Sequence, residues 1–462
     1  MGDMIPLTFI SYILFMENDM TEGNILKSII LYSIPLILGN FMQQLYNTFD
    51  SLIVGNFVSN RALAAVGASG QISFFLVAFY LGASSGAGIL ISQYYGAKKD
   101  DMLHAVIHNM LGIGIVLGIA ITIIGIIFCP TFLMWIKTPE DMMADSVTYL
   151  RIFFGGMIFQ VIYNMLAAVL NAVGNSKRSL LYLVISSLVN IALDLLFVCV
   201  FKWGIAGAAW ATIISQAICC ILILKYLCDV NTNYKVSIKD ITLQGYYVKR
   251  IVQMGLPAAI QNAVISFSNL LIQSGVNSYG TKAAAGFTAY MKVDGFDILP
   301  ILSFSLAATT FVGQNIGAGK RERAKKGAII IVLINIVYTV LMSVLMIGFD
   351  TEIISLFSRD TSVVESGVMC IWALAPFYLL LGLIHSFAGA IRGTGNTVGP
   401  MVIILFALCL YRVIWMALVR PYFHDIRGVY YTYPTSFALG AVLMVGYTVY
   451  LYFRVWKKEQ QL

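Results

Sequence analysis

The chain has 462 residues, of which 59% are hydrophobic and 11% are charged, with a mean hydropathy of +0.85 and a formal net charge of +7. Soluble domains carry roughly 45–50% apolar and about 25% charged residues, so this composition excludes a soluble enzyme or binding module. No cluster of Lys and Arg is interleaved with aromatic residues, so a nucleic-acid partner is not expected.

Long apolar stretches follow one another along the whole chain. A helix needs about 20 residues to cross a hydrocarbon core ~30 Å thick, and each stretch reaches at least ~18. The alternating ~10-residue segments of a β-barrel are absent, so the sequence predicts an all-α polytopic membrane protein with twelve transmembrane helices. The predicted spans are 29–53, 63–92, 105–128, 143–171, 179–200, 205–227, 251–276, 284–313, 327–348, 364–391, 398–420 and 429–453.

The segments outside these spans divide the chain. Residues 4–16 are apolar but too short to cross a bilayer, and no basic segment precedes them, so a cleaved signal peptide is not expected. They are either an interfacial or disordered extension or the product of a start-codon error, with Met20 as the true beginning. The longest polar segment joins the two halves. The predicted division is an N-terminal extension 1–23, an N-lobe 24–227, a linker 228–250, a C-lobe 251–455 and a tail 456–462.

The two lobes repeat each other at an offset of about 221 residues. The repeated strings, with both positions, are Gln93-Tyr94-Tyr95-Gly96-Ala97 and Gln314-Asn315-Ile316-Gly317-Ala318, Gly174-Asn175-Ser176 and Gly395-Asn396-Thr397, and Pro35 and Pro257. Matches spread over the full length indicate that a unit of six helices was duplicated. Membrane transporters are often built in this way.

Basic residues give the expected orientation. One set of loops holds 19 Lys and Arg residues, and the opposite set holds 7. The richer set includes the linker and the loops after the second and eighth spans. By the positive-inside rule, both termini and the linker are therefore expected in the cytoplasm, and the protein is expected to be a multi-pass protein of the plasma membrane.

Three other patterns suggest chemistry that the sequence does not support. The seven cysteines contain no CxxC pair and lie mostly inside spans, where free thiols act as small apolar groups. His104 and His108 have the i, i+4 spacing of metal ligands, but no third ligand is expected near them, so we predict solvated histidines at a helix end and no metal site. The string 313–320 lacks the Walker A spacing. Without an ATPase motif or a cofactor, transport must be driven by an ion gradient or by nothing.

A short set of ionisable residues lies at bilayer depth. An ionised Asp in the middle of a membrane helix costs about 2.5–3.5 kcal/mol on insertion scales, so each one kept there suggests a function. Asn190 precedes Asp194 by four residues and is expected on the same helix face. For Lys292 with Asp294 or Asp297, a structural ion pair or snorkelling to the helix end is the alternative. The set comprises Asp50, Asp194, Lys292, Asp294, Asp297, His385 and Arg412.

The repeated motifs resemble those of the multidrug and toxic compound extrusion (MATE) family of transporters over about residues 24–455. They are Gln-x-x-Gly-Ala after the second and eighth spans, Leu-Asn-Ala-Val-Gly-Asn at 170–175 and Ile-Arg-Gly-Thr-Gly-Asn at 391–396. The segment 43–50, with Asn190 and Asp194, is similar to the DinF-like branch. The NorM-like branch uses acids in the seventh and tenth spans, where this chain offers Gln261, Asn262 and His385, so a sodium site of that kind is not expected.

The resemblance implies roles for particular residues. Asp50, Asn190 and Asp194 would form a cation or proton site in the N-lobe. Polar groups expected around that site or in the transport cavity are Gln43, Tyr46, Asn47 and Asn164, with Asp294, Asp297 and Lys292 as secondary candidates in the C-lobe. Independently of the resemblance, Pro35 lacks an amide N–H and would let the first helix bend when Asp50 changes charge, although an ordinary proline near a helix start is equally consistent.

These observations together predict a secondary multidrug antiporter that exchanges cationic or amphipathic small molecules for protons by alternating access, as a monomer. Two carboxylates in one apolar lobe cannot both remain ionised without cost, which suits a proton carrier. Sodium coupling remains an alternative, because the same residues could supply an oxygen cage. A lipid-linked oligosaccharide flippase of the same superfamily is a further alternative, but such proteins line their cavity with several cationic residues.

Overall fold

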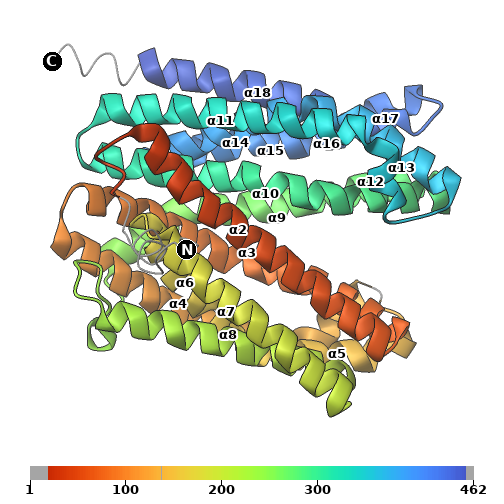
Figure 1. Cartoon of the computed structure of the whole chain (residues 1–462), viewed down its shortest axis with the longest axis horizontal. Helices are drawn as coiled ribbons and strands as arrows, with labels where there is room; N and C mark the ends of the chain where they lie inside the picture. The colour runs from red at the N-terminus through yellow and green to blue at the C-terminus, as the bar shows by residue number, and fades with distance from the viewer. Residues whose placement is uncertain (1–18, 137, 454–462) are drawn as a thin grey trace, which may run out of the picture. The chain divides into compact units, whose positions relative to one another are not determined.

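The computed structural model describes residues 19–136 and 138–453 (Figure 1). Within these ranges the elements are helical and no strand occurs. Eleven helices are long and apolar enough to cross a membrane, and the bent pair α5 and α6 provides a twelfth span. The predicted all-α fold with twelve transmembrane helices is thereby confirmed. Most of the predicted N-terminal extension and all of the predicted tail lie outside the described residues.

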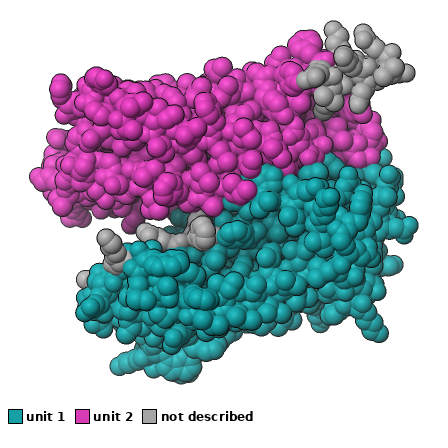
Figure 2. All heavy atoms as spheres, turned by 180° about the vertical axis from the view of Figure 1, so that it is seen from behind, with its two compact units in different colours: residues 1–259 teal, residues 260–462 magenta. Residues whose placement is uncertain are grey.

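The chain forms two compact units, residues 1–259 and 260–462 (Figure 2), which divide inside α9. The first helices are α2 (Ile25–Phe57), α3 (Asn60–Gly96), α4 (Asp100–Trp135), α5 (Glu140–Gly155), α6 (Met157–Ala172), α7 (Ser176–Asp194), the π-helix η1 (Leu195–Val200), α8 (Gly204–Asp229) and the 3-10 helix η2 (Ile238–Asp240). Those that follow are α9 (Gly245–Asn277), α10 (Thr281–Gly317), α11 (Arg321–Gly348), α12 (Asp350–Ser355), α13 (Thr361–Leu374), η3 (Ala375–Phe377), α14 (Tyr378–Gly393), α15 (Val398–Leu405), η4 (Phe406–Leu410), α16 (Tyr411–Ile414), η5 (Trp415–Val419), η6 (Arg420–Tyr422), α17 (Arg427–Tyr430) and α18 (Thr432–Leu451).

The fourth predicted span, 143–171, is two helices rather than one. The axes of α5 and α6 differ by 48° across the break at Gly156. A β-carbon at Gly156 would collide with the side chain of Ile213 in α8. The glycine therefore allows the chain to bend close to α8, and an apolar stretch alone gives no sign of that contact.

The repeated motifs form equivalent turns in the two halves. Gly174 and Gly395 have φ angles of 92° and 94°, a left-handed conformation that glycine adopts without steric cost. The side-chain oxygen of Asn175 accepts the backbone N–H of Arg178 at 3.4 Å, and that of Asn396 accepts the backbone N–H of Gly399 at 3.1 Å. The same turn chemistry thus explains why the motif occurs twice.

In unit 1, α2 packs along α7, and α7 packs along α8. The side chain of Asn24 caps the start of α2 by accepting the backbone N–H of Lys27 at 3.0 Å. On the other side of the unit, α4 packs against α3, α5 and α6 around the largest apolar core of the unit. This arrangement places the polar positions of α2, α7 and α8 next to one another.

Candidate functional site

The two acidic residues of the N-lobe are both buried in unit 1. Asp50 on α2 is 7% exposed, and Asp194 at the end of α7 is fully buried. The two carboxylates lie close enough to repel each other when both are ionised. Each has an Oδ1 atom without a hydrogen-bond partner among the described residues. The contact between α2 and α7 therefore joins two acids that are far apart in the sequence.

Asn190 connects this pair to α8. The amide orientation that satisfies both of its neighbours has the nitrogen donating to Asp194 Oδ2 at 3.1 Å and the oxygen accepting the backbone N–H of Thr212 at 3.3 Å. The i, i+4 spacing of Asn190 and Asp194 thus produces the expected contact on one helix face. Because the amide donates to the carboxyl group, it fixes the position of Asp194 next to α8.

Thr212 and Tyr149, which were not selected from the sequence, also belong to the site. The hydroxyl of Tyr46 on α2 pairs with the side chain of Thr212, which itself donates to the Ala208 carbonyl at 3.1 Å. Tyr149 on α5 is buried and lies within electrostatic reach of Asp50, Asp194 and Tyr46. Neither residue stands out along the chain, because a lone threonine hydroxyl in an apolar helix usually bonds its own backbone, and Tyr149 is one of 25 tyrosines.

The other predicted N-lobe residues make no side-chain hydrogen bond to this cluster in the part of the chain that the structure describes. Gln43 and Asn47 are exposed on α2. Asn164 donates its amide N–H to the Gln160 carbonyl of its own helix at 2.8 Å. Pro35 is buried within α2. The site that the structure assembles therefore consists of Asp50, Asn190, Asp194, Tyr46, Thr212 and Tyr149.

No basic side chain pairs with either acid of this cluster among the described residues. A buried charge normally needs a partner of opposite sign and complete hydrogen bonding. Directly after Asp194, the helix widens into the π-helix η1, an irregularity often found at functional sites. The arrangement is suited to binding a positive charge or a proton, since either would remove the repulsion between the two carboxylates.

A second polar cluster lies in unit 2. Asp294 on α10 accepts hydrogen bonds from the hydroxyls of Tyr290, at 3.4 Å, and Tyr378. Asp297 is 3% exposed; its Oδ1 accepts the Tyr338 hydroxyl at 3.0 Å, and its Oδ2 has no hydrogen-bond partner within the described ranges. These tyrosines hold both acids in place, although none of them was selected from the sequence.

A buried arginine balances the charge of this cluster. Arg412 on α16 is 4% exposed and lies within electrostatic reach of Asp294. Its Nε donates to Ser436 Oγ at 3.0 Å, its Nη1 donates to Asn269 Oδ1 at 3.4 Å, and its guanidinium lies 4.5 Å from the centre of the Tyr433 ring. The π-helices η4 and η5 flank the short helix that carries it.

Lys292 is not part of this cluster. Its side chain is exposed, with Nζ 6.0 Å from the centre of the Phe357 ring. Among the described residues no ion pair joins it to Asp294 or Asp297, so the alternative of a structural ion pair at this lysine is wrong.

Glu365, at the start of the tenth predicted span, is an exposed acid of α13. The described parts of α9, α13 and α14 contain no buried acid.

Comparison with known proteins gives consistent matches over both halves. The MatE family profile matches residues 35–196 and 257–417. The chain is 30% identical over 451 residues to the probable multidrug resistance protein YoeA of Bacillus subtilis (strain 168), covering 95% of this chain and 96% of that protein. It is 31% identical over 408 residues to the probable multidrug resistance protein YpnP of the same strain, covering 87% of this chain and 89% of that protein.

Solved structures show the same fold. One, described as the outward-facing conformation of a multidrug resistance MATE family transporter of the MOP superfamily, has a TM-score of 0.88 at 22% identity and covers 94% of this chain and 97% of its own. Another, a MATE in the bent conformation, has a TM-score of 0.89 at 22% identity and covers 95% of this chain and 98% of its own. At this level of identity the likeness concerns the fold.

Proposed function

Since this chain belongs to the MatE family of multidrug transporters, we propose that it exports cationic or amphipathic drugs in exchange for protons, with Asp50, Asn190 and Asp194 as the coupling site. It is a multi-pass membrane transporter and not an enzyme. The observation that carries the proposal is the pair of buried carboxylates that lacks a basic partner among the described residues.

A proton satisfies the chemistry of this pair. When one carboxyl is protonated, the repulsion between Asp50 and Asp194 disappears, and the new O–H can donate to one of the unpartnered carboxylate oxygens. Asn190 can keep donating to Asp194 in either state, because both a carboxylate and a carboxylic acid accept hydrogen bonds. The site can therefore load and release a proton without losing its contact to α8.

Exchange follows if the same acids are needed for the drug. A cationic drug and a proton both neutralise the pair, so binding of one opposes binding of the other. Each ligand then favours the conformation that binds it better, which is alternating access by population shift. Pro35 is the proposed position at which α2 bends between conformations, since a proline inside a helix removes one backbone hydrogen bond.

Sodium is the second candidate for the coupling ion. Oxygens from α2, α7 and α8 converge at the site, as a sodium cage would require. Against sodium, the Asn190 oxygen already accepts the backbone N–H of Thr212, and the Asn164 amide is oriented by its N–H bond to the Gln160 carbonyl of its own helix. The flippase alternative requires several buried cationic residues, whereas among the described residues Arg412, at 4% exposed, is the one fully buried Lys or Arg, and Arg392 is half-buried.

We further propose that the protein works as a monomer in the plasma membrane, with both termini and the linker in the cytoplasm. The excess of basic residues on one set of loops supports this orientation. The linker also contacts the start of α4 through Asn233 and Asp100, at 2.9 Å, and both residues lie between predicted spans, in segments that the charge count assigns to the same side.

Transport in proteoliposomes tests the coupling ion. An inward-directed ΔpH in sodium-free medium should drive export of a fluorescent cationic drug, and nigericin, which collapses ΔpH, should stop it. Transport that begins only after sodium is added, and that then runs without ΔpH, would contradict proton coupling. The flippase alternative would be supported if a pyrophosphate-linked lipid, rather than a cation, were the transported molecule.

A further inference from the structure

The linker between the two halves is folded onto α4 in unit 1. The backbone N–H of Ser237 donates to His108 Nε2 at 2.9 Å, and the backbone N–H of Gln244 donates to Asn109 Oδ1 at 2.5 Å. These two contacts hold the intervening segment, which includes η2 (Ile238–Asp240), beside the first turns of α4. The linker therefore has a defined place on the helix.

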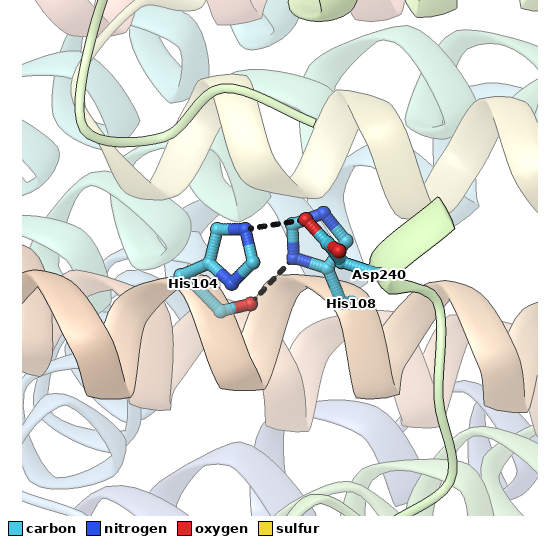
Figure 3. A group of neighbouring side chains, drawn as sticks. All are labelled: His104, His108 and Asp240. Carbon is cyan, nitrogen blue, oxygen red and sulfur yellow. Dashed lines mark hydrogen bonds and ion pairs between the residues drawn. The ribbon is translucent and has the colours of Figure 1, made fainter. Parts of the chain in front are cut away.

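This fold brings an acid to two histidines of α4 (Figure 3). His104 Nε2 is 3.4 Å from Asp240 Oδ2, and the two imidazole rings lie 3.9 Å apart between their centres. One ligand atom from each of His104, His108 and Asp240 lies within 4.8 Å of the others. The expectation of two solvated histidines without a third ligand is wrong, because His108 is 1% exposed and Asp240 arrives from the linker.

We propose that His104, His108 and Asp240 bind a divalent transition-metal ion of the zinc class, which fastens the linker to α4. Zinc binds imidazole nitrogen and carboxylate oxygen at roughly 2.0–2.2 Å, so two such ligands of a tetrahedral ion lie about 3.4 Å apart. The His104 and Asp240 atoms already have this separation. Their side chains are 44% and 51% exposed, which gives an ion access and leaves room for water as a fourth ligand.

His108 is prepared as the third ligand by its neighbours. Its Nε2 accepts from the N–H of Ser237, so the ring proton must be on Nδ1, which donates to the His104 carbonyl at 2.7 Å. Most metal-binding histidines are oriented by such a hydrogen bond from the ring nitrogen that does not bind the metal. The lone pair on Nε2 is therefore the one available to a metal, and its current partner is only a backbone amide.

Metal binding would exchange this amide contact for a metal bond. The ligand atoms, now up to 4.8 Å apart, must close to about 3.4 Å around the ion. The His104 ring, now tilted by 33° to the His108 ring with the centres 3.9 Å apart, must move away from it, and the N–H of Ser237 is released. A change in the exposure of this amide is therefore a signature specific to the proposed geometry.

The test uses the full-length protein in detergent, purified without a polyhistidine tag. Isothermal titration with Zn²⁺ should give one ion per chain, and Co²⁺ should give the intense visible bands of a tetrahedral site. The substitutions His104→Gln and Asp240→Asn, at exposed side chains, should each weaken binding at least tenfold, since losing even a hydrogen-bond partner of a ligand costs about 10–100-fold. The matched control is His424→Gln, an exposed histidine of unit 2, which should bind as the wild type does.

Hydrogen exchange provides the second measurement. With Zn²⁺ bound, the Ser237 amide should exchange faster while the rest of 230–244 is protected, and both changes should vanish in Asp240→Asn. Zinc binding that is equal in the wild type and in the His104→Gln/Asp240→Asn double variant would overturn the proposal. Sulfur-to-metal charge-transfer bands in the Co²⁺ spectrum would also overturn it, because they would place the ion on a cysteine.

Discussion

The substitution Asp50→Asn separates the coupling role of this residue from its structural role. Asparagine keeps the size of the side chain but can neither gain nor lose a proton. A pH difference of one unit is worth about 1.4 kcal/mol per proton, so each proton exchanged per drug molecule supports about a tenfold drug gradient. In proteoliposomes with the membrane potential clamped to zero, the wild type should build such a gradient, and Asp50→Asn should build none.

The structure also predicts that Asp50→Asn folds normally. Asp50 is 7% exposed and has no basic partner among the described residues, so the substitution breaks no ion pair. An ionised carboxylate at bilayer depth costs about 2.5–3.5 kcal/mol, and removing that cost should leave the thermal transition of the purified protein unchanged or higher. A loss of transport therefore cannot be attributed to unfolding if the transition does not fall.

The matched control is Asp145→Asn. Asp145 pairs with Arg61 at 3.2 Å, and the two side chains are 29% and 57% exposed. Exposed ion pairs contribute only about 0–1 kcal/mol, so this variant should keep both its stability and the full drug gradient. A wild-type gradient in Asp50→Asn, at equal incorporation into the liposomes, would refute the assignment of Asp50 to the coupling site.

Three further predictions follow from the remaining contacts. Asp194→Asn should abolish the drug gradient as Asp50→Asn does, whereas Asp297→Asn should lower transport more mildly; the reverse order in the same assay would move the coupling site to unit 2. Arg412→Met leaves the acids of its cluster without a buried counter-charge, so it should destabilise the protein by about 3–5 kcal/mol and lower its thermal transition. An unchanged thermal transition would contradict this balance of charges. Lys239→Cys, in a background without native cysteines, should react with an impermeant thiol reagent only after cells are opened, and labelling of intact cells would invert the proposed topology.

Cross-helix partners are the part of the site that the sequence left open. Asp50 and Asp194 were selected because a charge in an apolar span is costly wherever the helix packs. Thr212 and Tyr149 were not selected, because their roles depend on α8 and α5 facing the acids. Asn164, also expected near the acids, donates its amide N–H to the Gln160 carbonyl of its own helix. The sequence therefore identified the acids together with Asn190 and Tyr46, and not the partners that α8 and α5 contribute.

The sequence by itself determined the membrane class, the spans, the repeat and the buried acids. Each of these depends on local properties: apolar length, the spacing of turn residues and the presence of a charge at bilayer depth. A membrane helix satisfies its own backbone hydrogen bonds, so its existence can be read from its own residues. Its rotation and neighbours cannot, because side-chain packing between helices sets them. Only the tertiary structure bent the fourth span at Gly156, placed Arg412 beside Asn269 and brought Asp240 to His104.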